Sequence, residues 1–253
     1  MPWIIAAVPA VAAVAAAALI VLFILLTDGR YFGKRLMRWV YDRLGPAIFG
    51  AATETEHWHA LARELHLAGN ERILDVGTAV GDLPLTLAAM PGFHGQVTGV
   101  DWSPKMIAAA RASAQQRGLA DRARFQVVDV REGLPFSDGA FDTVCCLGLL
   151  ETWPQPEQIL RELCRVAAPD GTLVLSLYRR LASTHVALNL AWYREHLGPL
   201  RYTALRVVAS RRSQDVVIAR PEPMLTQPFR EFGHPRKSSF DRAHPGGRKE
   251  QET

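Results

Sequence analysis

The chain has 253 residues, 49% of them hydrophobic and 21% charged, which suffices for a sizeable buried core and excludes a disordered or collagen-like chain. The formal net charge of +4 is a small basic excess and does not predict nucleic-acid binding. Cys145, Cys146 and Cys164 are too few for a disulfide framework or a zinc cluster, so we expect thiols in a reducing compartment.

An apolar run lies near the start of the chain. From Trp3 to Leu26 no side chain is charged or strongly polar, and as a helix the run is about 36 Å long at about 1.5 Å per residue. The hydrocarbon core of a bilayer is about 30 Å thick, so residues 3–26 predict one transmembrane helix. A cleaved signal peptide is the alternative. We favour the anchor because no basic residue precedes the run and because the run exceeds the apolar region of a signal peptide.

Residues 27–53 form a basic segment after this run. The excess of cations predicts a single-pass membrane protein whose main domain lies on the cytoplasmic side. Phe32, Leu36, Val40 and Leu44 recur every four residues, as in an amphipathic helix that lies among anionic lipid headgroups. A surface helix packed on the following domain is a compatible alternative. The cations are Arg30, Lys34, Arg35, Arg38 and Arg43.

Residues 54–220 alternate between strand-like apolar runs and helical segments. The predicted strands are Arg72–Val76, Gln96–Asp101, Ala123–Val128, Phe141–Leu147 and Thr172–Tyr178. The predicted helices are Glu54–Leu67, one that ends at Met90, one capped by Ser103 that runs to Gln116, one from Pro156 to the turn Pro169-Asp170-Gly171, and Leu181–Leu197. Such alternation indicates parallel βαβ units in a doubly wound sheet.

The last two predicted strands break this pattern. Tyr202–Ala209 and Asp215–Ala219 are separated by only five residues, and a parallel crossover needs a dozen or more, so we expect a hairpin. The predicted fold class is therefore α/β: a seven-stranded doubly wound sheet, mostly parallel with a C-terminal antiparallel hairpin, preceded by one transmembrane helix. Residues 221–253 are rich in Pro, Gly, Ser and charge, which predicts a disordered tail.

The chemistry-bearing residues lie where predicted strands end. The first strand runs into the glycine-rich turn Asp75–Asp82 (DVGTAVGD), and ligands of doubly wound sheets bind at such a turn. Asp101 ends the second strand, where an acid accepts ribose hydroxyls, and Asp129 follows the third, where a carboxylate accepts an adenine amino group. Each acid alone is more often a strand-end or capping residue. Together they predict an adenosine without phosphates, because the turn has no Lys and its acids repel a pyrophosphate.

Four stretches resemble the class I S-adenosylmethionine-dependent methyltransferases, in the family's order. They are ILDVGTAVGDLPLTLA (Ile73–Ala88), VTGVDWSPKMIAAAR (Val97–Arg111), QVVDVREGLPFSDGAFDTV (Gln126–Val144) and ILRELCRVAAPDGTLVLS (Ile159–Ser176). The resemblance extends over residues 54–220. It looks closest to ubiquinone/menaquinone-biosynthesis C-methyltransferases and to bacterial phospholipid N-methyltransferases, the latter through RWVYDRLGPAIFG (Arg38–Gly50). The family usually has a third glycine where this chain has Ala79.

The resemblance implies S-adenosylmethionine as the cofactor and assigns residues to its parts. The implied contacts are Asp75, Gly77, Thr78 and Gly81 for the methionine part, Asp101 for the ribose, Trp102 and Met106 beside the adenine, Asp129 and Val130 for its amino edge, and the carbonyl of Leu147 for the cofactor's amino group.

The residues on the acceptor side are less defined. Methyl transfer from a sulfonium needs a positioned nucleophile, and a base only if the acceptor is protonated, so the catalytic residue stays unassigned. His57 and His59 are two apart and lie on divergent helix faces, so we expect no metal site. Weak candidates, each explained as simply by packing or exposure, are Tyr41, Glu151, Tyr178 and His185.

Three functions are compatible with these features. The first is a membrane-tethered methyltransferase, of the EC 2.1.1 class, acting on a lipid, quinone or other hydrophobic small molecule. The second is a methyltransferase of a soluble small molecule, such as a thiol, or of a protein. The third is a non-catalytic relative of the same fold, in which Ala79 has spoiled the pocket and the domain only binds partners.

Overall fold

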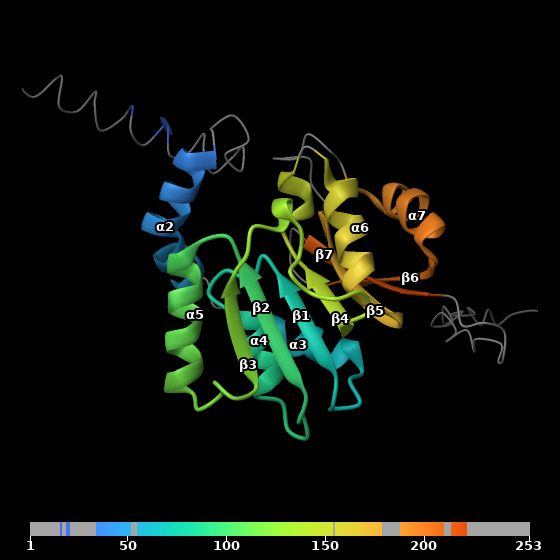
Figure 1. The fold of residues 1–253 in the computed structure, drawn as a ribbon, viewed down its shortest axis with the longest axis horizontal. Coiled ribbons are helices and arrows are strands. Elements are labelled where there is room, and N and C mark those ends of the chain that lie inside the picture. The colour runs from blue at the N-terminus through green and yellow to red at the C-terminus, as the bar shows by residue number, and fades with distance from the viewer. Residues whose placement is uncertain are drawn as a thin grey trace, which may run out of the picture. The chain divides into compact units, whose positions relative to one another are not determined.

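A computed structural model of the chain describes residues 16, 19, 20, 34–51, 55–153, 155–178, 188–209 and 214–221 (Figure 1). Of the predicted transmembrane run, only Ala16, Leu19 and Ile20 fall among them, and these three are helical and exposed. The rest of that run and the predicted tail lie outside the described residues. Among the residues that are described, no helix is long and apolar enough to cross a membrane.

The core is a seven-stranded sheet in the order β3-β2-β1-β4-β5-β7-β6. Its first five strands in the chain pair in parallel, and β7 pairs antiparallel with both β5 and β6. This confirms the mostly parallel sheet with a closing antiparallel hairpin. The strands are β1 (Arg72–Val76), β2 (Gln96–Asp101), β3 (Ala123–Val127), β4 (Phe141–Cys146), β5 (Ala167–Tyr178), β6 (Tyr202–Ala209) and β7 (Gln214–Pro221).

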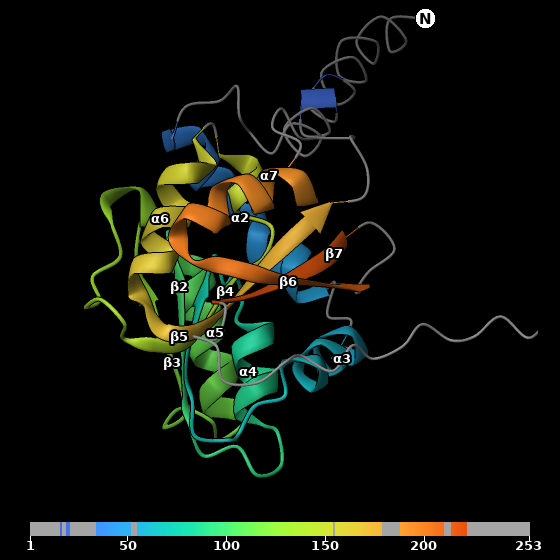
Figure 2. The same ribbon diagram turned by 90° about the vertical axis from the view of Figure 1, so that its right-hand side faces the viewer.

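Helices cover both faces of the sheet (Figures 1 and 2). The α-helices are α2 (Lys34–Ala51), α3 (Thr55–Leu65), α4 (Asp82–Ala88), α5 (Pro104–Gln116), α6 (Pro156–Val166) and α7 (Leu190–Leu197), and the short 3₁₀ helices are η1 (Val130–Glu132), η2 (Leu150–Thr152) and η3 (Gly198–Leu200). Neighbouring strand residues alternate between the two layers. Ile73 and Cys145 pack with α3, α4 and α5, whereas Leu74 and Cys146 pack with α6 and α7. The doubly wound architecture follows from this alternation.

Several predicted element bounds differ from the structure by one or two residues, and two starts, those of β5 and α7, differ by more. Strand β5 begins at Ala167, directly after α6, so the predicted turn at residues 169–171 lies inside it. The pairing with β4 jumps from Phe141–Ala167 to Thr143–Thr172, so the turn residues form a bulge while the ladder continues on both sides. Helix α7 begins at Leu190, inside the predicted helix Leu181–Leu197, because Asn189 caps it by accepting the N–H of Trp192. Residues 181–187 of that prediction lie outside the described residues.

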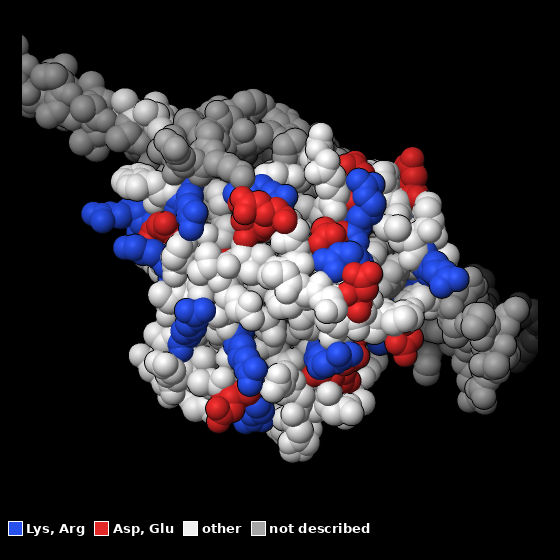
Figure 3. All heavy atoms as spheres, viewed as in Figure 1, with Lys and Arg blue, Asp and Glu red and all other residues white. Residues whose placement is uncertain are grey.

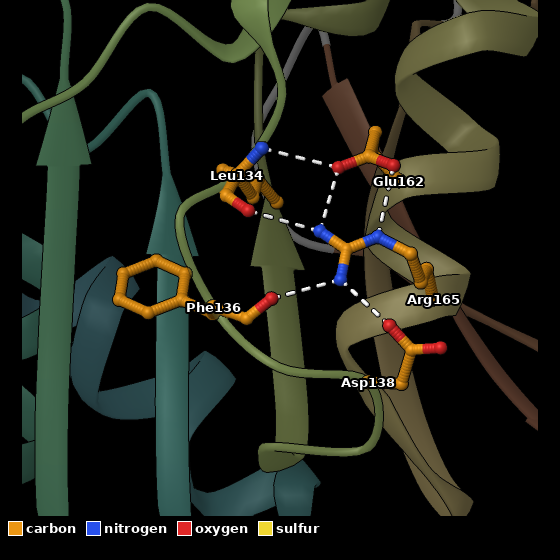
Figure 4. Close-up of polar contacts among 5 residues, drawn as sticks. All are labelled: Leu134, Phe136, Asp138, Glu162 and Arg165. Atoms are coloured by element: carbon orange, nitrogen blue, oxygen red, sulfur yellow. Dashed lines mark hydrogen bonds and ion pairs between the residues drawn. The ribbon is translucent and has the colours of Figure 1, made fainter.

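One arginine fixes the long connection between η1 and β4 (Figure 4). Arg165 of α6 donates to the carbonyls of Leu134 and Phe136 at 2.9 and 2.8 Å, and it forms ion pairs with Glu162 and Asp138. Glu162 also accepts the N–H of Leu134 at 3.1 Å. The ion pair lowers the pKa of Glu162 below its usual range. These contacts hold the amino end of β4 against α6.

Candidate cofactor site

The glycine-rich turn leads from β1 into α4 and contains three residues with positive φ. Gly77, Ala79 and Gly81 have φ of 82°, 49° and 84°. The N–H groups of Gly77 and Thr78 donate to the carbonyl of Val100 at 2.9 and 3.0 Å, which binds the turn to the end of β2. A Cβ on Gly81 would lie 2.7 Å from the ring of Phe125. The glycine at 81 is therefore required by packing as well as by backbone conformation.

Ala79 is the residue at which this chain departs from the family's usual glycine. Its φ of 49° lies in the left-handed region, which costs an ordinary residue about 1–2 kcal/mol and costs glycine almost nothing. Its N–H nevertheless points at Asp101 and donates to Oδ2 at 3.1 Å. The alanine therefore keeps the turn conformation that the glycine would have.

Asp101 joins the two neighbouring turns. One carboxylate oxygen accepts the N–H of Ala79, and the other accepts the N–H of Ser103 at 2.9 Å, at the start of α5. Burial raises the pKa of Asp101. The hydrogen bonds from the two backbone N–H groups lower this pKa by a smaller amount, and the nearby negative charge of Asp42 raises it further. The two backbone donors thus fix the carboxylate at the carboxyl end of β2, the position that the ribose-binding prediction gives it.

Asp75 is a deeply buried acid of the glycine-rich turn. It is 5% exposed at the carboxyl end of β1, and burial raises its pKa to about 7, with a smaller contribution from the charge of Asp101. The hydroxyl of Thr78 opposes this shift. Thr78 Oγ1 is itself buried and makes no hydrogen bond of good geometry to the described residues. A buried hydroxyl of this kind beside a buried acid is a suitable partner for a polar or cationic ligand group.

Helix α2 packs on the adenine side of the predicted site. Asp42 accepts a hydrogen bond from the hydroxyl of Ser103, which caps α5 by accepting the N–H of Met106 at 3.2 Å. Tyr41 lies edge-on to Trp102, with ring centroids 6.0 Å apart. Met106 is buried at 1% exposure. Two of the residues predicted beside adenine, Trp102 and Met106, are therefore positioned by contacts that involve α2.

Asp129 caps η1 and forms an ion pair with Arg131. Its carboxylate accepts the N–H of Arg131 at 3.2 Å and hydrogen bonds from Nε and Nη2 of the same residue. The guanidinium of Arg131 lies over the ring of Trp102, 4.7 Å from its centroid. Val130, the first residue of η1, is half-buried. The structure thus brings Asp129, Val130 and Trp102 together, with Arg131 between two of them.

The loop after β4 carries the acceptor-side candidate that the structure describes best. Glu151 is 3% exposed and accepts a hydrogen bond from the hydroxyl of Ser176, which accepts the N–H of Gly148 at 2.9 Å. Tyr193 donates to the carbonyl of Ser176 at 2.7 Å. This network fixes the backbone just after Leu147, whose carbonyl is the predicted partner of the cofactor's amino group.

The structure does not bring the remaining acceptor-side candidates together at one place. Tyr41 is half-buried against Trp102, at the adenine side. Tyr178 ends β5, and only its backbone is described. His185 lies outside the described residues. Across the described part of the chain, no group of three or more His, Cys, Asp or Glu side chains could hold a metal ion.

The residues present fit a sulfonium nucleoside. Asp75, which is buried, and Asp101, which is half-buried, lie at the ends of adjacent parallel strands, beside a turn that carries the buried hydroxyl of Thr78, unbonded among the described residues. Negative charge and hydroxyl acceptors suit a cationic ligand with a ribose, and the same acids would repel phosphates.

The chain matches the family described as Methyltransferase domain over residues 67–204, and it belongs to that family. Among curated relatives it is 41% identical to the demethylmenaquinone methyltransferase of Thermus thermophilus over 138 residues, 53% of this chain and 59% of that one. It is 34% identical to the phosphatidylethanolamine N-methyltransferase of Cereibacter sphaeroides over 140 residues, 54% of this chain and 63% of that one. The chain therefore spans less than two thirds of the length of these relatives.

Solved structures share the fold at low sequence identity. The magnesium protoporphyrin IX methyltransferase of Synechocystis PCC 6803, with bound SAH, is 19% identical with a TM-score of 0.61, and the match covers 75% of this chain and 99% of that one. The [4+2]-cyclase SpnF is 20% identical with a TM-score of 0.61, and the match covers 72% of this chain and 94% of that one. These likenesses concern the fold alone.

Sequence reasoning missed two contributors to the site. Asp42 reaches Ser103 from a helix 61 positions earlier in the chain, and nothing in the local sequence indicates this contact. Arg131 follows Asp129 by two residues, and this short spacing was the one available signal for their pairing. Both contacts depend on how the loops at the carboxyl ends of the strands meet.

Proposed function

We propose that this protein transfers the methyl group of S-adenosylmethionine to a lipid, a quinone or another hydrophobic small molecule. The observation that carries the proposal is the pair of acids, the buried Asp75 and the half-buried Asp101, at the ends of β1 and β2 in a chain of the methyltransferase-domain family. The bound cofactor supplies an electrophilic methyl group on a cationic sulfur, and the protein has to hold the acceptor in line with it.

The roles of the residues follow from their positions. Asp101 accepts the ribose hydroxyls while two backbone N–H groups hold its carboxylate in place. Asp75 becomes ionised when a cationic ligand approaches, because the added positive charge offsets the cost of burying the carboxylate. Glu151 is the acceptor-side carboxylate best placed to take up a proton if the acceptor is a phenol or an ammonium, with Ser176 holding its orientation.

The acceptor class is supported by relatives and by the helix beside the site. Two relatives are named for demethylmenaquinone, a quinone, and for phosphatidylethanolamine, a phospholipid. In this chain, Trp39 of α2 is 60% exposed, and its neighbours Arg38 and Arg43 are also exposed. Figure 3 shows cationic side chains in the region of α2. Tyr41, on the same helix, contacts Trp102 of the predicted site. An exposed aromatic ring among cations is typical of a surface that rests on anionic headgroups.

Residues 3–26 extend this proposal to a tether. A single-pass anchor followed by α2 at the headgroup level would keep the cofactor site near the cytoplasmic leaflet, where a lipid-soluble acceptor can enter without crossing water. The exposed apolar side chains of Leu19 and Ile20 are consistent with a segment that needs an apolar environment.

The acceptor class is tested with the full-length chain and a methyl-labelled cofactor. Vesicles made from a total lipid and quinone extract, and separately a soluble metabolite extract, are each incubated with the protein and with the Asp101→Asn variant. We expect label in the organic phase of the vesicle sample, and none with the variant. Label confined to the soluble extract supports the soluble-substrate alternative. Absence of label together with absence of S-adenosylhomocysteine binding overturns the enzyme proposal.

The membrane contact has its own test. Flotation with phosphatidylglycerol and with phosphatidylcholine vesicles compares the protein with Arg38→Glu/Arg43→Glu on α2. The matched control is Arg117→Glu/Arg124→Glu, which changes two exposed arginines at the end of α5 and in β3. We expect a preference for the anionic vesicles that only the α2 variant loses. An equal loss in the control, or no preference in the unchanged protein, contradicts the proposed role of α2.

A further inference from the structure

The side chain of Arg131 is largely shielded from solvent, and its contacts are mainly with other side chains. Its side chain is 13% exposed, and its guanidinium pairs in a two-pronged manner with Asp129 while its backbone N–H bonds to the same carboxylate. Three donors from one residue fix the plane of that carboxylate. Such a forked pairing is available to arginine and not to lysine.

The same guanidinium also contacts two indole rings. It lies 4.7 Å from the centroid of Trp102 and 5.1 Å from the centroid of Trp153. Trp102 follows β2, Asp129 follows β3 and Trp153 follows η2 in the loop after β4. Arg131 therefore links three consecutive loops at the carboxyl edge of the sheet through one cation.

A second arginine of the chain provides the contrast. Arg165 also forms a forked ion pair, with Glu162, and it contacts Asp138 and the backbone carbonyls of Leu134 and Phe136 in the connection that leads into β4 (Figure 4). None of these partners is a predicted cofactor contact. The contacts of Arg131 instead hold two side chains, Asp129 and Trp102, that are both predicted to contact adenine.

We infer that Arg131 is a positioning residue of the adenine subsite, which sets the orientation of the Asp129 carboxylate and of the Trp102 ring for the base. This inference deepens the proposed function and rests on its cofactor. A fixed carboxylate accepts the adenine amino group without first losing its own rotational freedom, so removing Arg131 weakens cofactor binding through Asp129. The reacting methyl group lies elsewhere on the cofactor, so turnover at saturating cofactor is unaffected.

The test is a double-mutant cycle on S-adenosylhomocysteine binding, measured by calorimetry on the full-length protein. The four proteins are the unchanged chain, Arg131→Gln, Asp129→Asn and the double variant. We expect each single change to weaken binding about 10-fold and the double variant to bind no more weakly than the weaker single, because Arg131 acts through Asp129. Effects that multiply in the double variant overturn the inference, as does an Arg131→Gln protein that binds as well as, or better than, the unchanged chain.

Two further variants separate positioning from folding. Arg165→Gln should lower the melting temperature and leave the dissociation constant of S-adenosylhomocysteine unchanged, whereas Arg131→Lys should keep the fold and recover only part of the lost affinity. In steady state, Arg131→Gln should raise KM for the cofactor with kcat unchanged, and an equal fall in kcat contradicts the inference. If the unchanged chain binds no S-adenosylhomocysteine, the proposed function fails. If it binds and only the Arg131 variants behave otherwise than expected, the inference alone fails.

Discussion

Acidic residues at the two edges of the sheet are held in opposite ways. At the amino edge, Asp142 of β4 pairs with Arg72 of β1 at 3.0 Å and also accepts its backbone N–H, which lowers the pKa of Asp142. At the carboxyl edge, Asp75 is buried and Asp101 half-buried, and desolvation raises the pKa of both. The same residue type thus has its charged form stabilised at one edge and penalised at the other.

On the proposed function, this difference separates acids that stabilise the fold from acids that bind the cofactor. An arginine partner offsets the cost of burying an acid, whereas burial without such an offset makes the ionised form unstable until a positive group arrives. Asp129 lies between these cases, because it is at the carboxyl edge and yet pairs with Arg131. The carboxyl edge is therefore where the fold accepts a loss of stability for the sake of binding.

The largest expected effect concerns Asp75 and pH. Its folded pKa of about 7 lies above its ordinary value of 3.8, so its contribution to stability is fully present below pH 3.8 and is lost as pH rises through 7. Asp75→Asn removes this loss and should stabilise the protein at pH 8 by at most about 4 kcal/mol, since one pKa unit corresponds to about 1.4 kcal/mol. Urea unfolding of the unchanged protein and of Asp75→Asn at pH 5 and pH 8 measures this difference in stability. If the two proteins lose stability equally over this range, the buried acid does not behave as described.

The next effect concerns ligand binding by Asp101. Asp101→Asn removes the charge and places an amide N–H₂ against one of two backbone donors, Ala79 N–H or Ser103 N–H. We expect S-adenosylhomocysteine to bind about 100-fold more weakly, which is near 3 kcal/mol for a charged hydrogen-bond acceptor lost from a buried site. Calorimetric titration measures this, and a change of less than threefold contradicts a ribose-binding role.

A smaller effect is expected at Ala79. Ala79→Gly relieves the positive φ but adds freedom to the unfolded chain, so the net gain in stability should be about 0.5 kcal/mol. Affinity for S-adenosylhomocysteine should stay the same, because Ala79 already keeps the turn bonded to Asp101. A 10-fold gain in affinity would instead mean that the methyl group crowds the cofactor, which is the premise of the non-catalytic alternative.

Much of the fold could be predicted because its strongest signals are local. The bounds of β1, β2, β6 and α5 are those of the sequence prediction. For example, β1 ends at the glycine-rich turn, and α5 begins at the Ser103 cap with Pro104 as its first residue. The start of β5 could not be predicted, because a turn sequence and a bulge look alike until the pairing with β4 is known. The start of α7 was available from Asn189, a good capping residue, and was missed.

The candidate site was predictable in position but not in its contacts. That acids end β1 and β2 and follow β3 can be read from the chain, and the parallel sheet then brings them to one edge. Which of them has an arginine partner cannot be read in this way. The pairing of Asp129 with Arg131 and the approach of Asp42 to Ser103 depend on loops and on α2, whose packing is a long-range property.

A further small effect is expected at the amino edge and carries the opposite sign. Asp142→Asn breaks a pair whose side chains are 57% and 40% exposed, so solvent screening limits the loss of stability to about 1 kcal/mol or less. The lowered pKa of Asp142 means that its contribution is present above the unfolded pKa and is lost as pH falls through the folded one. Asp142→Asn should therefore differ from the unchanged protein mainly at neutral pH and converge with it in acid, while Asp75→Asn diverges from it as pH rises. Neither S-adenosylhomocysteine binding nor its pH dependence should change in Asp142→Asn. If either changes, the assignment of stability to the amino edge and of cofactor binding to the carboxyl edge is wrong.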